Sequence, residues 1–190
     1  LRRQRQMCIR DRRFNRELVR RYARGRTVLN TFCYTGGFSV YALAGGAREV
    51  CSIDSSERAV ALADANVRLN FGEEAPHTSL AVDAVEYLKD IGDRYDMIIL
   101  DPPAFAKHHK VLGNAMQGYK RLNARALAQI KSGRLLFTFS CSQAVSKELF
   151  RTTVFSAAAI AGRKVRILHQ LTQPADHPIN ICLLYTSDAA

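Results

Sequence analysis

The sequence lacks a CxxC cysteine pair, and its cysteines are odd in number: Cys8, Cys33, Cys51, Cys141 and Cys182. Neither a disulfide framework nor a zinc knuckle is therefore indicated, and no metal site is predicted. Reduced thiols in a cytoplasmic protein are the expected state. One of these thiols is then available for chemistry.

The sequence also lacks an apolar run long enough to cross a membrane, because its longest runs, 97–100 and 135–139, have the length of a strand. No apolar segment follows the basic N-terminus, so no secretory signal is predicted. Repeats and low-complexity segments are absent. A chain of 190 residues, 47% of them hydrophobic, is therefore expected to form one globular domain.

Acidic residues are scarce relative to basic ones, 17 against 28, which leaves a net charge of +11. Such a charge favours a polyanionic partner such as RNA. Much of it lies at one end, because residues 1–26 hold eleven arginines. A solvated basic helix or arm is an equally good explanation of the charge alone.

Strand-like apolar runs alternate with runs of helical period along the chain. Strands are predicted at 27–32, 49–53, 79–82, 95–100, 135–140 and 164–171. Helices are predicted at 14–23, 38–44, 57–69, 85–91, 117–131 and 143–161. This alternation predicts an α/β fold with an open, doubly wound, mostly parallel sheet, whose ligands bind at the carboxyl ends of the strands.

The first predicted strand runs into a glycine-rich turn, Tyr34-Thr35-Gly36-Gly37-Phe38, which a helix follows. A strand, a glycine turn and a helix N-terminus in this order are typical of nucleotide-like cofactor sites. The glycines do not fit the spacing of a NAD fingerprint, and the lysine of a P-loop is absent. Taken alone, the segment is also compatible with a plain connecting turn.

Three aspartates follow successive predicted strands: Asp54, Asp83 and Asp101. Asp54 comes eighteen residues after Gly36, where a carboxylate accepts hydrogen bonds from ribose hydroxyls. Asp83 is placed to reach the exocyclic amine of an adenine, although helix capping is an alternative role for it. A cofactor with adenine and ribose but no pyrophosphate fits this set, and S-adenosylmethionine is the candidate.

Two prolines stiffen the turn after the fourth predicted strand, Asp101-Pro102-Pro103-Ala104-Phe105. Such a turn holds a carboxylate and a backbone carbonyl beside a flat substrate. Phe105 is a candidate for stacking on a base, and packing in the core is an equal alternative. The basic segment 107–110, beginning at Lys107, suits phosphate or is simply a solvated loop.

Cys141 lies between Ser140 and Ser142, directly after the fifth predicted strand. In the predicted sheet this position faces the same cleft as Asp101. Cys141 is therefore a candidate nucleophile, which must act as a thiolate. Cys33 and Cys51 are expected to fill the core.

Several strings together resemble the catalytic domain of the bacterial large-subunit ribosomal RNA cytosine-C5 methyltransferases, whose full-length members carry an N-terminal PUA domain. The resemblance covers residues 13–178. It rests on 11–16, 29–42, 52–56, Asp101-Pro102-Pro103-Ala104-Phe105-Ala106-Lys107, 118–123, Phe139-Ser140-Cys141-Ser142 and 176–178.

The resemblance implies a Rossmann-like class I methyltransferase fold with S-adenosylmethionine as cofactor and ribosomal RNA as partner. Cys141 would attack C6 of a cytosine, and Asp101 would stabilise the adduct near N3. The cofactor-binding residues would be Phe32, Tyr34, Thr35, Gly36, Gly37, Asp54, Ser55, Asp83, Ala84 and Asp101. The RNA-binding residues would be Pro102, Phe105, Lys107, Lys120, Arg13 and Arg16.

Two alternatives stay open. An RNA guanine-N-methyltransferase on the same fold would need no thiol, and the Ser140-Cys141-Ser142 string argues against it. A non-catalytic fragment that binds S-adenosylmethionine or RNA is the other. The oligomeric state is not predicted.

Parts of the family pattern have no counterpart here, namely the PUA domain and a final antiparallel strand, so we expect a sheet without its last strand. Residues 7–12 and 182–190 resemble translated adaptor sequence. We therefore expect 1–12 to be a non-native or disordered arm, 13–178 the methyltransferase domain, and 179–190 a non-native tail.

Overall fold

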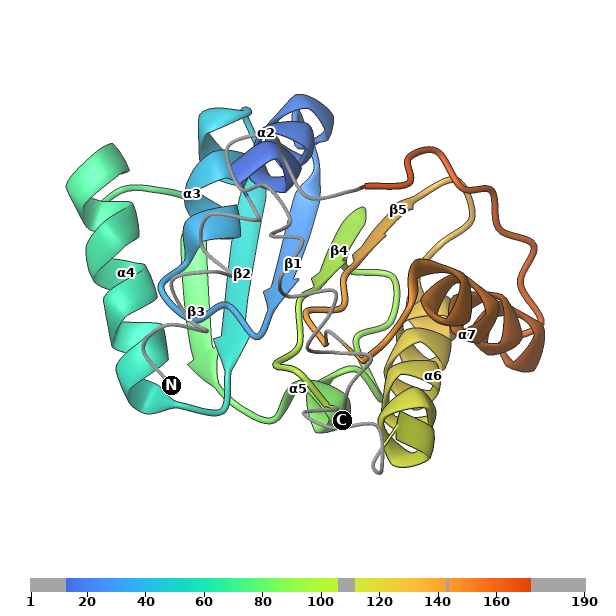
Figure 1. The fold of residues 1–190 in the computed structure, drawn as a ribbon. Helices are drawn as coiled ribbons and strands as arrows, with labels where there is room; N and C mark the ends of the chain where they lie inside the picture. Colours follow the sequence, from blue (N-terminus) through green and yellow to red (C-terminus); the bar gives the residue numbers. More distant parts are fainter. Residues whose placement is uncertain (1–12, 106–111, 143, 172–190) are drawn as a thin grey trace.

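A sheet of five parallel strands forms the centre of the computed structural model, which describes residues 13–105, 112–142 and 144–171 (Figure 1). The strand order is β3-β2-β1-β4-β5. The strands are β1 (Thr27–Thr31), β2 (Glu49–Asp54), β3 (His77–Ala81), β4 (Met97–Leu100) and β5 (Leu135–Thr138). The helices are α2 (Arg13–Tyr22), α3 (Gly37–Ala44), α4 (Glu57–Phe71), α5 (Ala84–Tyr87), α6 (Leu112–Gln129) and α7 (Lys147–Ile160).

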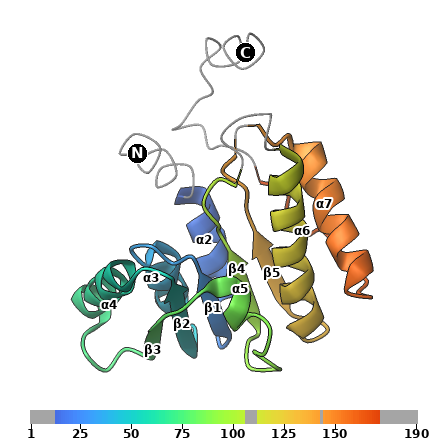
Figure 2. The ribbon, with the colours of Figure 1, turned by 90° about the horizontal axis from the view of Figure 1, so that it is seen from below.

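Alternate residues of the central strands point to opposite faces of the sheet, and each face has its own apolar core. Val28, Val50 and Met97 pack with residues of α2, α3 and α4. Leu29 and Ile98 pack with residues of α6 and of the chain around α5. Helix α7 packs against α6 (Figures 1 and 2). The sheet therefore lies between two helical layers, which confirms the predicted doubly wound α/β fold.

Most predicted elements are confirmed with shifted ends, but the predicted helix at 85–91 is only partly correct. Helix α5 ends at Tyr87, and the chain continues in tight turns in which Lys89 N–H donates to the Glu86 carbonyl at 3.0 Å. Leu88 and Ile91 are nevertheless buried. Their apolar spacing reflects burial against the sheet and not a continued helix.

The sixth strand predicted at 164–171 is wrong, because residues 163–171 form no regular structure. Their alternating apolar side chains Val165, Ile167 and Leu168 are exposed. The segment lies beside α2, where His169 Nε2 is 2.8 Å from the Tyr22 hydroxyl. A strand requires an adjacent strand with which it forms backbone hydrogen bonds. The alternation of side chains does not show whether such a strand is present.

Local signals explain where several helices begin and how they pack. The Ser56 hydroxyl caps α4 by accepting a hydrogen bond from Ala59 N–H at 3.3 Å, and Ser146 caps α7 in the same way. At the end of α3, a Cβ atom on Gly45 would lie 2.1 Å from the Arg20 carbonyl oxygen, so glycine permits the close approach of α2. No helix in the described ranges is both long and apolar enough to span a membrane.

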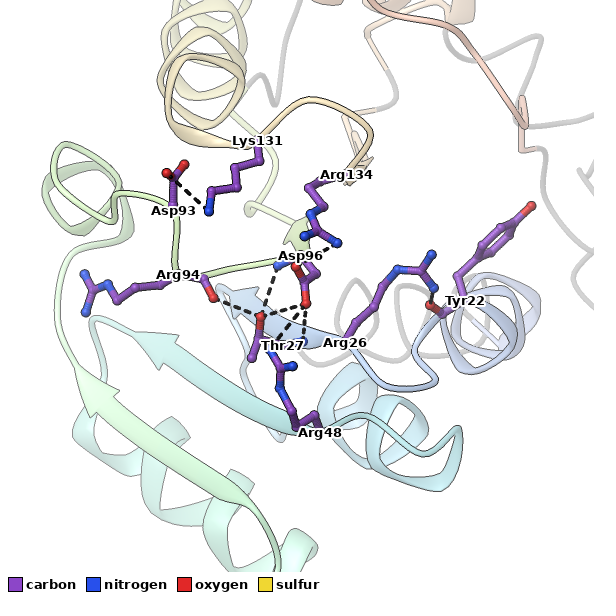
Figure 3. A network of polar contacts seen from close by, with 9 residues as sticks. All are labelled: Tyr22, Arg26, Thr27, Arg48, Asp93, Arg94, Asp96, Lys131 and Arg134. Carbon is purple, nitrogen blue, oxygen red and sulfur yellow. Dashed lines mark hydrogen bonds and ion pairs between the residues drawn. The ribbon is translucent and has the colours of Figure 1, made fainter.

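A network around Asp96 joins the amino ends of the strands (Figure 3). The Asp96 carboxylate, 14% exposed, accepts hydrogen bonds from the backbone N–H and the hydroxyl of Thr27, each at 3.1 Å. It also pairs with Arg134 at 3.0 Å and with Arg48 at 3.7 Å. Because Thr27 begins β1, Arg48 precedes β2 and Arg134 precedes β5, one carboxylate connects three strands to β4.

We predict that Asp96→Asn lowers the free energy of unfolding by about 2 kcal/mol, since hydrogen bonds to a charged group contribute about 1.5–3 kcal/mol. Urea denaturation at pH 7 measures this loss. Asp93→Asn is the matched control, because Asp93 is exposed and forms an ion pair at the surface with Lys131, at 3.3 Å. It should lose less than about 1 kcal/mol. Equal losses in the two variants would contradict the role of Asp96.

The same network predicts a pH dependence. Burial alone would raise the pKa of Asp96, but the hydrogen bonds from Thr27 and the charges of Arg134 and Arg48 outweigh it and hold the pKa below its usual value. A carboxyl with a lowered pKa stabilises the folded state above its unfolded pKa of about 3.9, and this stabilisation is lost as the pH falls further. The stability difference between wild type and Asp96→Asn should therefore be constant near pH 7 and shrink below about pH 4.

Candidate active site

The turn between β1 and α3 has a strained backbone. Phe32 and Tyr34 have positive φ angles of 54° and 50°, which are uncommon for bulky residues. Gly36 has a φ of 74°, and a Cβ atom there would lie 2.9 Å from the Cβ of Ala63 on α4. Both the backbone angle and the space therefore require glycine at Gly36. Thr35, between these residues, is half-buried.

Asp54 fixes this turn from the end of the neighbouring strand. Its Oδ2 accepts a hydrogen bond from Tyr34 N–H at 3.1 Å, and its Oδ1 accepts one from Ser56 N–H at 3.0 Å. A carboxylate offers about four acceptor positions, so capacity remains for ligand hydroxyls. Ser55, between Asp54 and Ser56, is exposed. Asp54 thus contacts the glycine turn directly, and its predicted contact with ribose hydroxyls stays a prediction.

A chain of buried hydrogen bonds supports α3 from within the sheet. Asn30 Nδ2 donates to Ser39 Oγ at 2.8 Å, Ser39 Oγ lies 2.6 Å from Ser52 Oγ, and Ser52 Oγ lies 2.7 Å from His77 Nε2. His77 Nδ1 is 3.3 Å from Asp64. Burial lowers the pKa of His77, against the charge of Asp64, so the ring is neutral at pH 7.

The direction of these hydrogen bonds follows from the chemistry of the groups. An ionised Asp64 only accepts, so His77 Nδ1 carries the proton and Nε2 accepts from Ser52. Ser52 then accepts from Ser39, which accepts from Asn30. The hydrogen bonds of the row therefore run in one direction, from Asn30 to Asp64, and they hold Ser39, two residues into α3, over β1 and β2.

Asp83 is the N-cap of α5, where its Oδ1 accepts a hydrogen bond from Glu86 N–H at 2.9 Å. The capping role considered for it is therefore the one seen. Val82 N–H donates to the Asp54 carbonyl at 2.9 Å, so the ends of β2 and β3 are adjacent. Ala84 is buried behind Asp83. A contact of Asp83 or Ala84 with adenine stays a prediction.

Cys141 lies beside the proline turn that follows β4. Leu100 and Thr138 are partners in the β4–β5 ladder, and Phe139 N–H donates to the Leu100 carbonyl at 2.9 Å. Beyond this point, Cys141 Sγ is 3.5 Å from the carbonyl oxygen of Pro102, the residue after Asp101. Cys141 and Asp101 are both half-buried. The two predicted catalytic residues therefore lie at adjacent strand ends, as expected.

The other described thiols are unsuited to nucleophilic chemistry, which confirms their expected place in the core. Cys33 and Cys51 are both buried. Burial, together with the charge of Asp54, raises the pKa of Cys33 to about 12. Cys33 thus stays a neutral thiol although it lies within the glycine turn.

The predicted RNA-binding residues are more scattered. The Arg16 guanidinium lies 5.5 Å from the Tyr41 ring centroid, and its Cδ would be 3.4 Å from a Cβ atom on Gly37, so Arg16 lies against the start of α3. Arg13 is exposed on α2, and Lys120 is half-buried on α6. Lys107 lies outside the described residues.

Pro102 is buried and Phe105 half-buried, and the Phe105 ring packs against Tyr119 at a centroid distance of 4.7 Å. Phe105 therefore packs partly in the core, which was the alternative to stacking on a base.

The sequence patterns did not single out Tyr119 of α6. It is fully buried, and its hydroxyl lies 3.0 Å from Ser142 Oγ and accepts from Ser140 Oγ at 3.1 Å. A tyrosine at one position of a helix carries no local signal of such a role. In the described part of the chain, no group of three or more His, Cys, Asp and Glu side chains is arranged to hold a metal ion.

Comparisons with known proteins agree with this geometry. The model of the family described as "S-adenosylmethionine-dependent methyltransferase" matches residues 1–180. Ribosomal RNA large subunit methyltransferase I of Tolumonas auensis is 46% identical over 172 residues, and that of Aeromonas hydrophila 42%; each match covers 89% of this chain. The chain spans 43% of the length of these curated relatives.

Solved structures share the fold. The crystal structure of SMU.776 complexed with SAH has a TM-score of 0.78 at 28% identity, over 90% of this chain and 45% of that one. The SAM-dependent methyltransferase from Agrobacterium tumefaciens has a TM-score of 0.65 at 24% identity, over 78% and 50% of the two chains. The second likeness bears on the fold alone.

We predict that Gly36→Ala destabilises the protein more than Gly25→Ala does. The two glycines have nearly equal φ angles, 74° and 70°, but a Cβ atom on Gly25 meets nothing within 4 Å. Gly25→Ala should therefore cost about 1–2 kcal/mol from the backbone alone. Gly36→Ala should cost about 1–3 kcal/mol more, because the new methyl group clashes with Ala63.

Urea denaturation of both variants measures the difference. Equal losses of unfolding free energy in the two variants would show that α4 shifts at Ala63 to make room, and that this contact does not hold the turn.

Proposed function

The chain belongs to the family of S-adenosylmethionine-dependent methyltransferases, and on this premise we propose that it transfers a methyl group from S-adenosylmethionine to C5 of a cytosine in large-subunit ribosomal RNA. The relatives named above are ribosomal RNA methyltransferases, and the net charge of +11 suits an RNA substrate. Choice of the C5 position rests on Cys141.

The contact between Cys141 and the proline turn carries the proposal. A half-buried thiol lies 3.5 Å from the Pro102 carbonyl, one residue from the Asp101 carboxyl group. Addition of a nucleophile to a cytosine ring requires a thiolate on one side and a group that stabilises charge on the ring nitrogen. Methylation of an exocyclic amine would require no thiol at this point.

The residues of the turn after β1 fit the cofactor. The proposed ligands are Phe32, Tyr34, Thr35, Gly36, Gly37, Asp54, Ser55, Asp83, Ala84 and Asp101. Asp54 keeps acceptor capacity for the two hydroxyls of a ribose. The start of α3 and the Arg16 guanidinium beside it provide positive potential for the carboxylate of the methionine portion. When bound, the cofactor supplies an electrophilic methyl group on a sulfonium.

The chain's own residues perform the remaining steps. The Cys141 thiolate forms a bond to C6 of the cytosine, the electron pair of the C5–C6 double bond moves to C4–C5, and the pair of the C4–N3 double bond moves onto N3. Asp101 holds a proton or hydrogen bond at N3 and so stabilises the adduct. C5 becomes nucleophilic and is methylated. A base then removes the C5 proton, and the electron pair of that C–H bond restores the double bond and expels Cys141.

Contacts with RNA are proposed for Arg13, Arg16, Lys107, Lys120, Pro102 and Phe105. Arg16 lies where its charge suits either an RNA phosphate or the cofactor carboxylate. A cytosine within a duplex must first be unstacked, which costs a few kcal/mol.

We predict that Cys141→Ala abolishes methyl transfer and leaves cofactor binding within twofold of wild type, because Cys141 is assigned to the substrate and not to the cofactor. Isothermal titration with SAH and a methyl-transfer assay on undermethylated ribosomal RNA measure the two quantities. Cys51→Ala is the matched control, since it removes a buried thiol in the core. It should lower stability without abolishing turnover. Full turnover by Cys141→Ala would disprove the nucleophile assignment.

The nature of the product tests the function itself. Mass spectrometry of nucleosides from the methylated RNA should show 5-methylcytosine. A methylguanine would overturn the C5 assignment in favour of an N-methyltransferase. No product despite cofactor binding would indicate a non-catalytic fragment.

A further inference from the structure

We propose that Tyr119 is a positioning residue. It holds the loop at residues 140–142, called the Cys141 loop, in a fixed geometry relative to the turn at residues 101–105, called the Asp101 turn. The inference rests on the proposed function in so far as Cys141 and Asp101 are the reacting groups. Tyr119 itself is fully buried on α6, so it acts through its neighbours and not on substrate.

The Tyr119 hydroxyl bonds to both residues that flank Cys141. Ser140 Oγ donates to it at 3.1 Å, and Ser142 Oγ lies 3.0 Å away. Ser140 Oγ in turn accepts a hydrogen bond from Ser142 N–H at 3.3 Å. Since the Tyr119 oxygen accepts from Ser140, its own proton is available for Ser142. The three groups close a ring of hydrogen bonds around the backbone of Cys141.

The phenol keeps the proton that this arrangement needs. Burial raises the pKa of Tyr119, although its hydrogen bonds with Ser140 and Ser142 act in the opposite direction. The hydroxyl is therefore neutral throughout the working pH range and serves as donor and acceptor at once. Ser142 is buried as well, 5% exposed, so water does not easily replace this partner.

The Tyr119 ring supports the other catalytic segment. Its centroid lies 4.7 Å from that of Phe105, the last residue of the Asp101-Pro102-Pro103-Ala104-Phe105 turn. The preceding residue, Gly118, leaves room for this contact, because a Cβ atom there would lie 3.2 Å from Phe105 Cδ2. The Phe150 ring of α7 packs edge-on with the Tyr119 ring at a centroid distance of 5.4 Å. One side chain of α6 thus contacts residues of both loops and of α7.

The contact between Cys141 Sγ and the Pro102 carbonyl joins directly the two segments that Tyr119 also connects. Tyr119 connects to Cys141 through the serines and to Pro102 through Phe105. A displacement of about 1 Å between reacting groups lowers a rate by about a hundredfold. A rigid buried phenol that sets the distance between two loops is therefore expected to control the rate more than the affinity.

The test is Tyr119→Phe in the full chain, which keeps the ring and removes the hydroxyl. We expect kcat for methyl transfer to fall about tenfold to a hundredfold, with the dissociation constant of SAH within twofold of wild type. Tyr95→Phe is the control, because it removes another phenolic hydrogen bond, a partly buried one to Tyr87 at 2.8 Å, on a distant element. It should leave kcat unchanged.

A second readout needs no turnover. Alkylation by iodoacetamide, followed thiol by thiol with peptide mass spectrometry, should be several-fold faster at Cys141 in Tyr119→Phe, while Cys33 and Cys51 stay protected. General loosening of the fold would instead increase alkylation of all three. Ser142→Ala should show the same selective effect, and adding it to Tyr119→Phe should change little, because the two act as one unit.

The outcomes separate the two proposals. If wild type forms no 5-methylcytosine, the proposed function fails, while the alkylation pattern still decides whether Tyr119 orders the Cys141 loop. If Tyr119→Phe changes neither kcat nor Cys141 alkylation by more than twofold, the positioning role is overturned. A parallel rise in alkylation at all three cysteines would also overturn it, in favour of a purely structural role.

Discussion

The contact between Gly36 and Ala63 is the constraint on which the carboxyl edge of this sheet depends. It brings the turn after β1 against α4, with no room for even a methyl group between them. Helix α4 follows directly from β2, whose last residue, Asp54, bonds to Tyr34 within the same turn. A turn held from both sides in this way tolerates the positive φ angles of Phe32 and Tyr34, which the surrounding packing must impose.

The two edges of the sheet have different properties. At the amino edge, Asp96 connects β4 to Thr27, Arg48 and Arg134, so that one carboxylate faces two guanidinium groups. At the carboxyl edge, the turn after β1 has a strained backbone, and polar groups such as Asp101 and Cys141 are only half-buried. Bonding at one edge keeps the parallel strands in register, and this allows the other edge, where the ligands are proposed to bind, to carry a strained backbone.

The sequence predicted the alternation of strands and helices because parallel strands buried on both faces, such as β4, read as short apolar runs. It also predicted the glycine turn and the place of Asp54 near it, since both follow from strand ends that meet at one edge. The strand at 164–171 failed because amphipathic alternation contains no information about a neighbour to pair with. The role of Tyr119 was missed for a related reason: its partners Ser140 and Ser142 are about twenty residues away, and only tertiary packing brings them together.

Placement decides which thiol of this chain is suited to chemistry. Cys33 lies within the glycine turn, yet burial and the nearby charge of Asp54 oppose its ionisation. Cys51 is buried among apolar side chains of β2 and its neighbours. Cys141 differs in its surroundings: it is half-buried, it contacts a backbone carbonyl, and its two neighbours are bonded to a buried phenol. A nucleophile must be accessible and yet confined to one geometry, and among the described cysteines that combination is found at Cys141.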